Sequence, residues 1–299
     1  MTNKNIKQRL LFIVNQGSGH KDESLSEQII NYFSESDIGI EIFELPRACN
    51  LEQVKSAIEN SNADRVIAVG GDGTLKLVAE CLLNTPTPIG IVPTGSANGM
   101  AKELGIPLDI EPALKVAATG NTQKIHATLV NKELCIHLSD IGFNAYLVKK
   151  FDELPTRGMW TYAKSAWHAF WNHRKMNVQF KVGDRDIRSS AAMVVIANAT
   201  QYGTGFQINP DGKLNDDKFE VILIKEYAVM EIIKIWLSKL PWNPKKIESF
   251  QASEVQITTK HKAHFQVDGE YLGKTNKIEA KLLPNAIQII VPELTGNVP

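Results

Sequence analysis

A glycine-rich run at residues 70–74, Gly-Gly-Asp-Gly-Thr, places one carboxylate, Asp72, between a strand-like and a helix-like stretch. Glycines at such a turn let backbone N–H groups approach an anion, and the following helix N-terminus adds partial positive charge. The turn therefore suits a nucleotide phosphate. Because the charge of Asp72 would repel a bare phosphate, we expect it to hold Mg²⁺ or to accept a proton from an attacking hydroxyl, as phosphoryl transfer requires.

Two further turns of similar composition lie nearby in the sequence, at residues 15–19 and 93–99. Each follows an apolar stretch, so backbone amides and small hydroxyl side chains are available to cradle phosphates. Taken alone, the first of them is more typical of an ordinary loop. A fourth turn, far downstream, carries Asp268 and Glu270, and a solvated hairpin is its simpler interpretation.

The elements that must position these turns alternate in the first part of the chain. Apolar strands at 10–14, 39–43, 65–69 and 89–92 alternate with helical stretches at 24–34, 51–59, 75–83, 97–104 and 111–118. This pattern predicts a parallel sheet with helices on both faces, in which ligands bind at the carboxyl ends of the strands. The three turns are therefore expected to converge at one edge of the sheet.

After residue 124 the sequence changes to β-branched and apolar runs, at 125–138, 178–182, 191–197, 219–224, 255–259 and 287–291. These predict a mainly antiparallel second domain, interrupted by helices at 158–171 and 227–240. The expected division is a nucleotide-binding α/β domain at 1–124 and a β domain at 125–299.

Composition narrows the class of protein. The 299 residues are 43% hydrophobic and 22% charged with a formal net charge of +0, which is typical of a globular protein and argues against nucleic acid as a partner. The three cysteines are far apart and odd in number, so neither a disulfide framework nor a zinc site is expected, and a cytoplasmic location fits. We find no apolar run long enough to cross a membrane.

The motifs in this order resemble the diacylglycerol kinase catalytic-domain family, which includes bacterial soluble lipid kinases and the sphingosine and ceramide kinases. The resemblance rests on Gly-Gly-Asp-Gly-Thr, on Pro-Thr-Gly-Ser-Ala-Asn at 93–98 and on Asp-Gly-Glu at 268–270, and it extends to residues 139–144 and 198–205. It implies an N-terminal α/β domain like that of NAD kinases and phosphofructokinases, a C-terminal β-sandwich, and ATP bound between them.

The resemblance also implies roles for individual residues. Asp72, Asp268 and Glu270 would be the catalytic carboxylates, and whether Asp72 or Glu270 removes the hydroxyl proton stays open. The residues implied around the nucleotide are Asn15, Gly17, Ser18, Gly19, Gly70, Gly71, Asp72, Gly73, Thr74, Gly95, Ser96 and Asn98.

Some bacterial relatives hold a structural Mg²⁺ in an acidic segment that corresponds to residues 210–218. Carboxylate and carbonyl oxygens suit such a cation, and the implied ligands are Leu214, Asp216 and Asp217, with Asp216 the best match. A solvated acidic turn beside Lys213 and Lys218 is the alternative.

The chain departs from the family pattern in two places. After residue 75 the family commonly continues Asn-Glu, whereas this chain has Lys76-Leu77, so one usual nucleotide or metal contact is missing. We expect Lys76 on the solvent face of its helix, with a phosphate contact as the alternative. The usual Asn-Pro of the first turn is replaced by Asn15-Gln16.

The stretch 158–171 places Trp160, Trp167 and Trp171 on one helical face near basic residues, which suits a membrane interface, although core packing explains the same pattern. The predicted function is an ATP- and Mg²⁺-dependent kinase of a diacylglycerol-like or sphingoid lipid, peripheral to the membrane, with homodimerisation left open. The alternatives are a kinase of a soluble acceptor, like an NAD kinase, and a non-catalytic lipid- or nucleotide-binding protein.

Overall fold

The computed structural model describes residues 6–18, 24–46, 49–152, 175–200, 208–209, 212–225 and 245–293. The predicted helices at 158–171 and 227–240 lie outside these residues. The chain forms two compact units, one of Met1–Ile125 with Asn285–Pro299 and the other of His126–Pro284. The boundary expected from the sequence kept residues 285–299 with the second domain, whereas the structure groups them with the first, because the chain returns there to pair with a strand.

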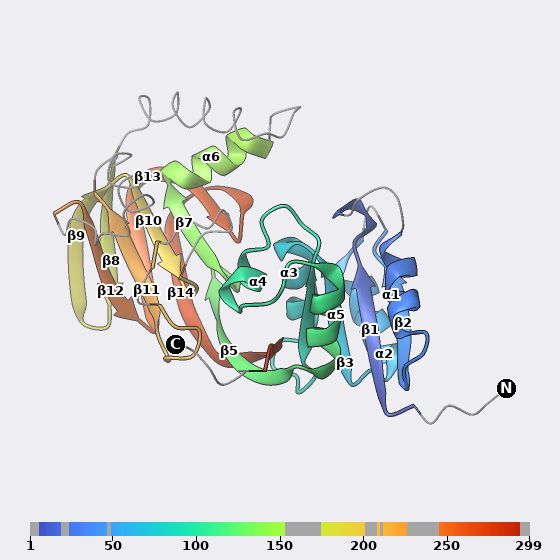
Figure 1. Ribbon diagram of the computed structural model, residues 1–299. Helices are drawn as coiled ribbons and strands as arrows, with labels where there is room; N and C mark the ends of the chain where they lie inside the picture. Colours follow the sequence, from blue (N-terminus) through green and yellow to red (C-terminus); the bar gives the residue numbers. More distant parts are fainter. Residues whose placement is uncertain are drawn as a thin grey trace. The chain divides into compact units, whose positions relative to one another are not determined.

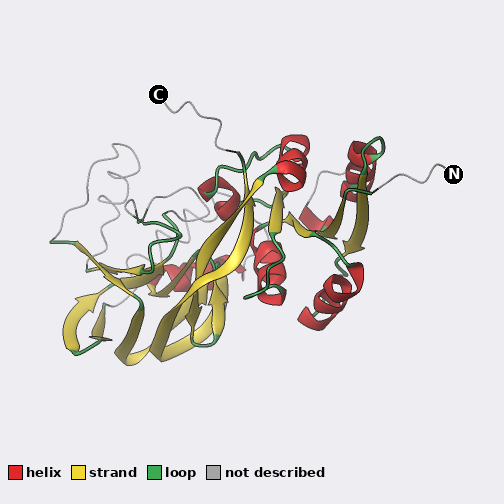
Figure 2. Cartoon of the chain, turned by 90° about the horizontal axis from the view of Figure 1, so that it is seen from below, coloured by secondary structure: helices red, strands yellow, loops and turns green. Residues whose placement is uncertain are grey.

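The first unit is built on a parallel sheet with helices on either side of its strands (Figure 2). Strand β1 pairs with β2 on one side and β3 on the other, β3 pairs with β4, and the end of β14 lies beside β4 in parallel register at Ile289 and Ile89. Strands buried on both faces need apolar runs, and β1 is buried from Leu10 to its last residue. The strands are β1 (Gln8–Val14), β2 (Ile38–Glu44), β3 (Arg65–Gly70), β4 (Ile89–Pro93) and β14 (Glu270–Val291).

Local capping sets where the first two helices of this unit begin. Ser24 with Glu27 forms a capping box at one helix, and Asn50 with Gln53 forms the same box at the next, so orphan N–H groups of both helices are satisfied. These ends agree closely with the predicted ones. The helices are α1 (Leu25–Phe33), α2 (Leu51–Ser61), α3 (Asp72–Cys81), α4 (Gly99–Glu103) and α5 (Ile110–Thr119), with a 3₁₀ turn at Gln16–Ser18.

The second unit consists mainly of antiparallel strands (Figure 1). Strand β10 lies between β7 and β11, β11 pairs with β12, and β13 pairs with β7, β8 and β14. Its elements are β5 (Asn121–Val130), which begins in the first unit, β6 (Glu133–Cys135), β7 (Leu138–Gly142), α6 (Phe143–Asp152), β8 (Met176–Val182), β9 (Arg185–Ala191), β10 (Met193–Ala197), β11 (Phe219–Ile224), β12 (Ile247–Ala252) and β13 (Glu254–Val267).

The apolar run at 125–138 does not form a single strand: it contains the end of β5, all of β6 and the first residue of β7. It breaks at Asn131 and Lys132, whose φ angles are 50° and 77°, and Val130 then pairs with Glu133 across a two-residue turn. A two-residue hairpin loop requires positive φ at both positions, which asparagine tolerates well. Helix α6 is a second difference, since the sequence analysis predicted no helix there.

An extensive apolar cluster fills the second unit. Alternate residues of β10, β11 and β13 point into it, together with fully buried Phe180 on β8 and Phe219 at the start of β11. The predicted architecture, an α/β unit with a parallel sheet followed by a β-sandwich with antiparallel strands, is confirmed.

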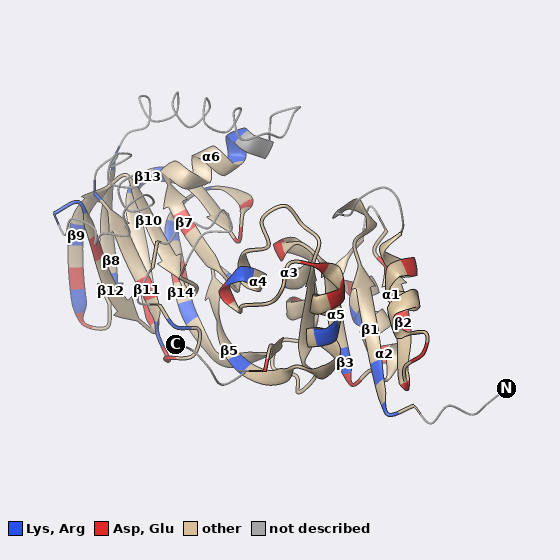
Figure 3. Cartoon of the chain, viewed as in Figure 1, with Lys and Arg blue, Asp and Glu red and all other residues tan. Residues whose placement is uncertain are grey.

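Charges of both signs are interspersed over the described elements (Figure 3). Lys149 and Lys150 fall in the last turn of α6, where they complement the negative end of the helix dipole. Within the described ranges, none of the helices combines the length and hydrophobicity needed to span a bilayer.

Candidate functional site

The three glycine-rich turns follow β1, β3 and β4 and are tied together by hydrogen bonds. The Asn15 N–H donates to the Val69 carbonyl at 2.9 Å, and its Nδ2 donates to Thr74 Oγ1 at 3.4 Å. The third turn is tied to the second because the Thr94 N–H donates to the Gly70 carbonyl at 3.0 Å. The structure therefore brings the three turns together at the carboxyl end of the parallel strands, as their order along the chain predicted.

Glycine is needed here because the second and third turns approach each other backbone to backbone. A Cβ atom on Gly95 would lie 2.5 Å from the Gly71 Cα, and one on Gly70 would lie 2.2 Å from Thr74 Oγ1. No side chain fits at such distances. By contrast, a Cβ on Gly73 would meet nothing within 4 Å. The closeness of Gly71 and Gly95, rather than backbone freedom, explains the two glycines.

Asp72 joins the second turn to the third. It is the first residue of α3, three residues earlier than the predicted helix start, and its carboxylate accepts the Gly99 N–H at 2.9 Å and the Met100 N–H at 3.0 Å. Asp72 thus caps α4, whose own N-cap residue, Asn98, makes no side-chain cap bond. A metal or proton-transfer role would be additional to this one and stays a prediction.

Asn98 shapes the third turn from within. It has a left-handed φ of 53°, its Oδ1 accepts the Gly95 N–H at 3.0 Å, and its Nδ2 donates to the Gly95 carbonyl at 2.8 Å. Ser96 is exposed at the tip of the same turn. An exposed hydroxyl beside loop backbone is suited to a polar ligand.

The first turn is held by Asn15 and Gln16. Asn15 Oδ1 accepts the Gly17 N–H at 3.1 Å, and Gln16 Nε2 donates to Ser26 Oγ at 3.0 Å and to Glu44 Oε1 at 2.9 Å. Hydrogen bonds from Ser26 and Gln16 lower the pKa of Glu44 against a weaker desolvation effect. Gln16 therefore anchors the position where the family usually has proline. The side chain of Ser18 and all of Gly19 lie outside the described residues.

Lys76 differs from its prediction. It was expected on the solvent face of the helix, but it is only 8% exposed, on a turn of α3 where Thr74 and Leu75 are also buried. Burying a charged group costs free energy unless it is paired or hydrogen-bonded. The sequence did not reveal this, because the helical spacing of residues 74–79 is compatible with either face.

In the second unit, Asp268 has a clear structural role. Its Oδ1 accepts the N–H groups of His137 and Leu138, each at 3.0 Å, and its Oδ2 accepts that of Ile136 at 2.9 Å. Asp268 itself lies in a two-residue hairpin between β13 and β14, with a φ of 50° followed by 86° at Gly269. The carboxylate fixes the loop between β6 and β7. Glu270 begins β14 beside it and is exposed.

A buried polar network, which the sequence analysis did not assign, supports this hairpin. Asp140 and Gln266 are each 1% exposed and lie opposite each other on β7 and β13. Gln266 Nε2 donates to Asp140 Oδ2, and Gln266 Oε1 accepts the Gly269 N–H at 2.7 Å. The signal in the sequence was the presence of polar residues inside otherwise apolar strands, namely Ser139 and Asp140 in β7 and Gln266 in β13.

The implied metal ligands lie in a turn before β11. The Leu214 carbonyl accepts the His126 N–H at 2.8 Å, and Asp217 lies over His126, its N–H donating to the ring Nε2 at 3.1 Å. Asp216 Oδ1 is buried and has no hydrogen-bond partner among the described residues, where no group of three ionisable ligands forms either. Asp216 therefore remains the predicted ligand that best fits a cation.

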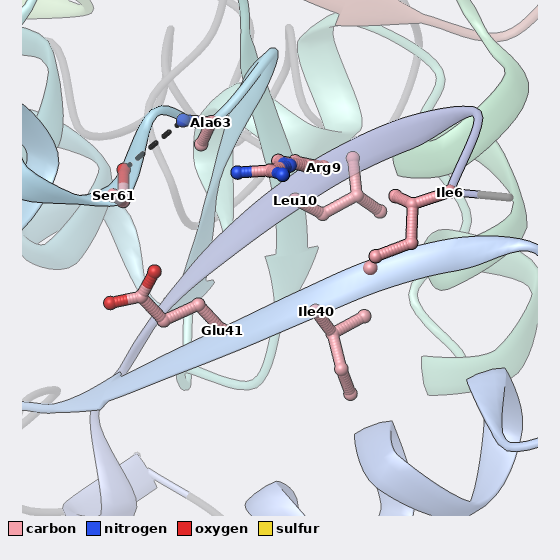
Figure 4. A pocket seen from close by; sticks show the side chains of 8 residues that line it. Ile6, Arg9, Leu10, Ile40, Glu41, Ser61 and Ala63 are labelled. Carbon is pink, nitrogen blue, oxygen red and sulfur yellow. Dashed lines mark hydrogen bonds between the residues drawn. The ribbon is translucent and has the colours of Figure 1, made fainter. Parts of the chain in front are cut away.

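A separate hollow in the first unit lies along the beginnings of β1 and β2 and is lined by Ile6, Gly39, Glu41 and Ser61 among others (Figure 4). In open α/β sheets ligands bind at the carboxyl ends of the strands, and this hollow lies at the amino ends. It contains none of the predicted site residues.

Comparison with known proteins agrees with this arrangement. Residues 9–130 match the diacylglycerol kinase catalytic domain, and residues 139–291 match the YegS C-terminal NAD kinase beta sandwich-like domain. The chain belongs to the diacylglycerol kinase catalytic-domain family. The glycine-rich turns described above lie within the first matched segment and the Asp268 hairpin within the second.

Individual family members extend the comparison. The chain is 31% identical to a probable lipid kinase YegS-like of Klebsiella pneumoniae, over 77% of this chain and 79% of the relative. It is 27% identical to a probable lipid kinase YegS-like of Chromohalobacter salexigens, over 80% of each.

Two solved structures share the fold. A diacylglycerol kinase from Bacillus anthracis has a TM-score of 0.74 at 18% identity, covering 96% of this chain and 97% of that one. An NAD kinase from Archaeoglobus fulgidus in complex with ATP has a TM-score of 0.56 at 16% identity, covering 95% and 94%.

The close approach of the two turns can be tested with two alanine substitutions. We expect Gly95→Ala to destabilise the protein by about 1–3 kcal/mol, because its Cβ forces the backbones apart. Gly73→Ala, in the same motif but with open space around it, is the matched control. Chemical denaturation of both variants measures the difference, and equal stabilities would contradict the proposed close packing.

The role of Asp268 can be tested with an asparagine, which tolerates the left-handed backbone but removes the charge and replaces one acceptor oxygen with an NH2 donor. Asp268→Asn is expected to lower the free energy of unfolding by about 1–3 kcal/mol, because buried N–H groups lose their acceptor. Asp184→Asn, in the exposed turn between β8 and β9, should change it by less than about 0.5 kcal/mol. Thermal unfolding of the two variants provides the comparison, and a neutral Asp268→Asn would refute this role.

Proposed function

We propose that this chain is an ATP- and Mg²⁺-dependent lipid kinase that phosphorylates a hydroxyl of a diacylglycerol-like or sphingoid lipid at a membrane surface. Family membership supports the kinase activity. Binding of a nucleotide is supported chiefly by one observation: the three glycine-rich turns that follow β1, β3 and β4 lie together, with Gly71 and Gly95 in backbone contact. Clustered backbone amides and a helix N-terminus favour a polyphosphate.

In the proposed reaction the lipid hydroxyl oxygen attacks the γ-phosphorus while the bond to the ADP oxygen breaks, and a carboxylate takes the hydroxyl proton. Two of the three predicted carboxylates already accept backbone N–H groups, two at Asp72 and three at Asp268. Glu270 is exposed at the start of a strand. The exposure of Glu270 to solvent favours it as the base, and the N–H groups bonded to Asp72 and Asp268 give those two carboxylates the task of holding their loops.

Asp216 is the residue proposed to hold a structural Mg²⁺, with the Leu214 carbonyl and Asp217 beside it. A carboxylate oxygen that is buried and unpartnered among the described residues is unfavourable without a cation. Such an ion would offset the desolvation of Asp216 and stiffen the turn before β11. Gln251 Nε2 lies 3.5 Å from the other Asp216 oxygen and also donates to Glu220 at 3.0 Å, which links the turn to β11 and β12.

A kinase of a soluble acceptor is the second candidate, because the fold is shared with an NAD kinase that was solved with ATP. The two functions differ in the product that receives the phosphate. Both predict transfer from ATP, whereas a non-catalytic nucleotide- or lipid-binding protein predicts none.

The activity can be tested by following ³²P from [γ-³²P]ATP into a panel of pure lipids, separated by chromatography. We expect a labelled lipid with the wild type, and a loss of about 100-fold or more in turnover for Glu270→Gln, because the base is removed. Glu279→Gln, an exposed carboxylate on the same strand, is the control. Label in a soluble compound would favour the second candidate, and no transfer would refute both.

The same assay tests Asp72. We expect Asp72→Asn to lower turnover strongly and to reduce stability by about 1–2 kcal/mol, because one N–H of α4 loses its acceptor. Wild-type turnover by this variant would restrict Asp72 to capping α4.

The metal site can be tested by thermal unfolding with and without Mg²⁺. Addition of Mg²⁺ should raise the unfolding temperature of the wild type, since a ligand that binds only the folded state stabilises it. Asp216→Asn should lose this response and, in EDTA, should be at least as stable as the wild type, because a half-buried carboxylate whose Oδ1 has no partner among the described residues has been neutralised. Equal responses to Mg²⁺ in the two proteins would contradict the site.

A further inference from the structure

Gln266 occupies a buried position between a carboxylate and the hairpin that carries Glu270. It lies on β13, opposite Asp140 of β7 and opposite Tyr271 of β14. The residue is only 1% exposed, and its side chain lies on the opposite face of the strand from Phe265 and Val267, which belong to the apolar core. A polar side chain in such a place needs a reason beyond packing, because an apolar residue of the same size would avoid the desolvation of its amide.

The orientation of the Gln266 amide is determined by its partners. An ionised carboxylate only accepts hydrogen bonds, so the nitrogen must face Asp140 and the oxygen must face the Gly269 N–H, 2.7 Å away. Asp140 is itself held in place: its Oδ1 accepts the Ala145 N–H at 2.8 Å, and its Oδ2 accepts from Asn144 Nδ2 at 2.6 Å. The network therefore has one arrangement in which every one of these groups is satisfied.

This arrangement acts on the residue directly before Glu270. Gly269 has a φ of 86° and Asp268 a φ of 50°, so the two-residue turn has positive φ at both positions. The Gln266 amide holds the Gly269 N–H on one side, and the Asp268 carboxylate holds the loop at 136–138 on the other. The direction in which Glu270 leaves the turn is thereby set by two independent attachments.

We propose that Gln266 is a positioning residue for Glu270, and that Asp140 sets the orientation of its amide. This inference rests on the proposed role of Glu270 in proton removal. Gln266 contacts neither nucleotide nor lipid in this scheme. It fixes the backbone from which the carboxylate projects, and a base displaced by about 1 Å loses about 100-fold in rate.

Gln266→Met keeps the length of the side chain and removes both hydrogen bonds. We expect kcat to fall about 100-fold with little change in the KM for ATP, because only the placement of the base is altered. Gln256→Met is the matched control: Gln256 lies on the same strand, and its amide bonds the surface residue Glu279 at 3.0 Å. Its kinetics should match those of the wild type.

Gln266→Glu gives a readout that a purely structural role would not move. The introduced carboxyl group retains an acceptor for the Gly269 N–H but can donate to Asp140 only when one proton is shared between the two carboxyl groups. Two neighbouring carboxylates raise the pKa of the pair. Activity of this variant should approach that of the wild type at acid pH and fall as the shared proton is lost on raising the pH.

Other titratable groups surround this position and are the same in the wild type and in the variant. They are His264 on β13, Asp268 in the following turn, Tyr271 on β14, and Tyr146 and Lys149 on α6. Because they titrate in both proteins, the difference between the two pH profiles reports the shared proton.

The decisive experiment combines these variants with Glu270→Gln in the same ATP-to-lipid assay. If Gln266 acts through Glu270, adding Gln266→Met to Glu270→Gln will cause little further loss, whereas independent effects would multiply. Multiplied losses, a wild-type kcat for Gln266→Met, or a Gln266→Glu pH profile parallel to that of the wild type would overturn the inference.

The same set separates this inference from the proposed function. Wild-type turnover by Glu270→Gln alone would remove Glu270 as the base, whereas an inactive Glu270→Gln with a fully active Gln266→Met would remove only Gln266. Thermal unfolding of each variant at each pH identifies any loss that follows from unfolding. Should Gln266→Met fail to fold, the pH profile of Gln266→Glu, which keeps the Gly269 bond, decides the question.

Discussion

Backbone contact between two loops is the constraint on which the first unit depends. The Gly71 and Gly95 backbones are so close that any side chain on Gly95 would overlap its neighbour, so both loops must be built from residues that leave this space empty. Once they meet, Asp72 can reach the start of α4, and Asn15 can reach Thr74. Three loops separated by some twenty residues or more then behave as one surface rich in backbone N–H groups. Such a surface is fixed before any ligand arrives, which lowers the ordering that binding must impose.

The aspartates of the sequence motifs accept hydrogen bonds from backbone N–H groups. Asp72, Asp268 and Asp140 each accept two or more hydrogen bonds from the ends of helices or from loops, and each does so within its own unit. A carboxylate is well suited to this because its two oxygens accept several charge-assisted bonds at once. These carboxylates therefore hold loops and helix ends in place, and Glu270 differs from them in lying exposed.

Much of the first unit could be predicted because β1, β3 and β4 are buried almost throughout and α1 and α2 carry caps, so hydrophobic runs mark the strands and Ser24 and Asn50 mark where those two helices begin. The meeting of the three glycine-rich turns could also be predicted, because the carboxyl ends of parallel strands lie at the same edge of a sheet. Three features could not be predicted in this way. The burial of Lys76 depends on neighbours that its position in the helix does not identify. The start of helix α6 is capped by Asp140, which belongs to the preceding strand and not to the helix. The hydrogen bond between Asp140 and Gln266 joins residues 126 positions apart. Each depends on tertiary contact rather than on local periodicity.

The long strand β14 has a consequence for how the chain folds. It begins at Glu270 in the second unit, and by Ile289 it lies beside β4 of the first. During synthesis on the ribosome, the β4 side of the parallel sheet therefore stays uncovered until Ile289, 200 residues after its partner Ile89, has been made. An uncovered strand edge invites pairing with other chains. Nascent molecules of this protein would then be prone to aggregation during the interval between the synthesis of β4 and that of the end of β14.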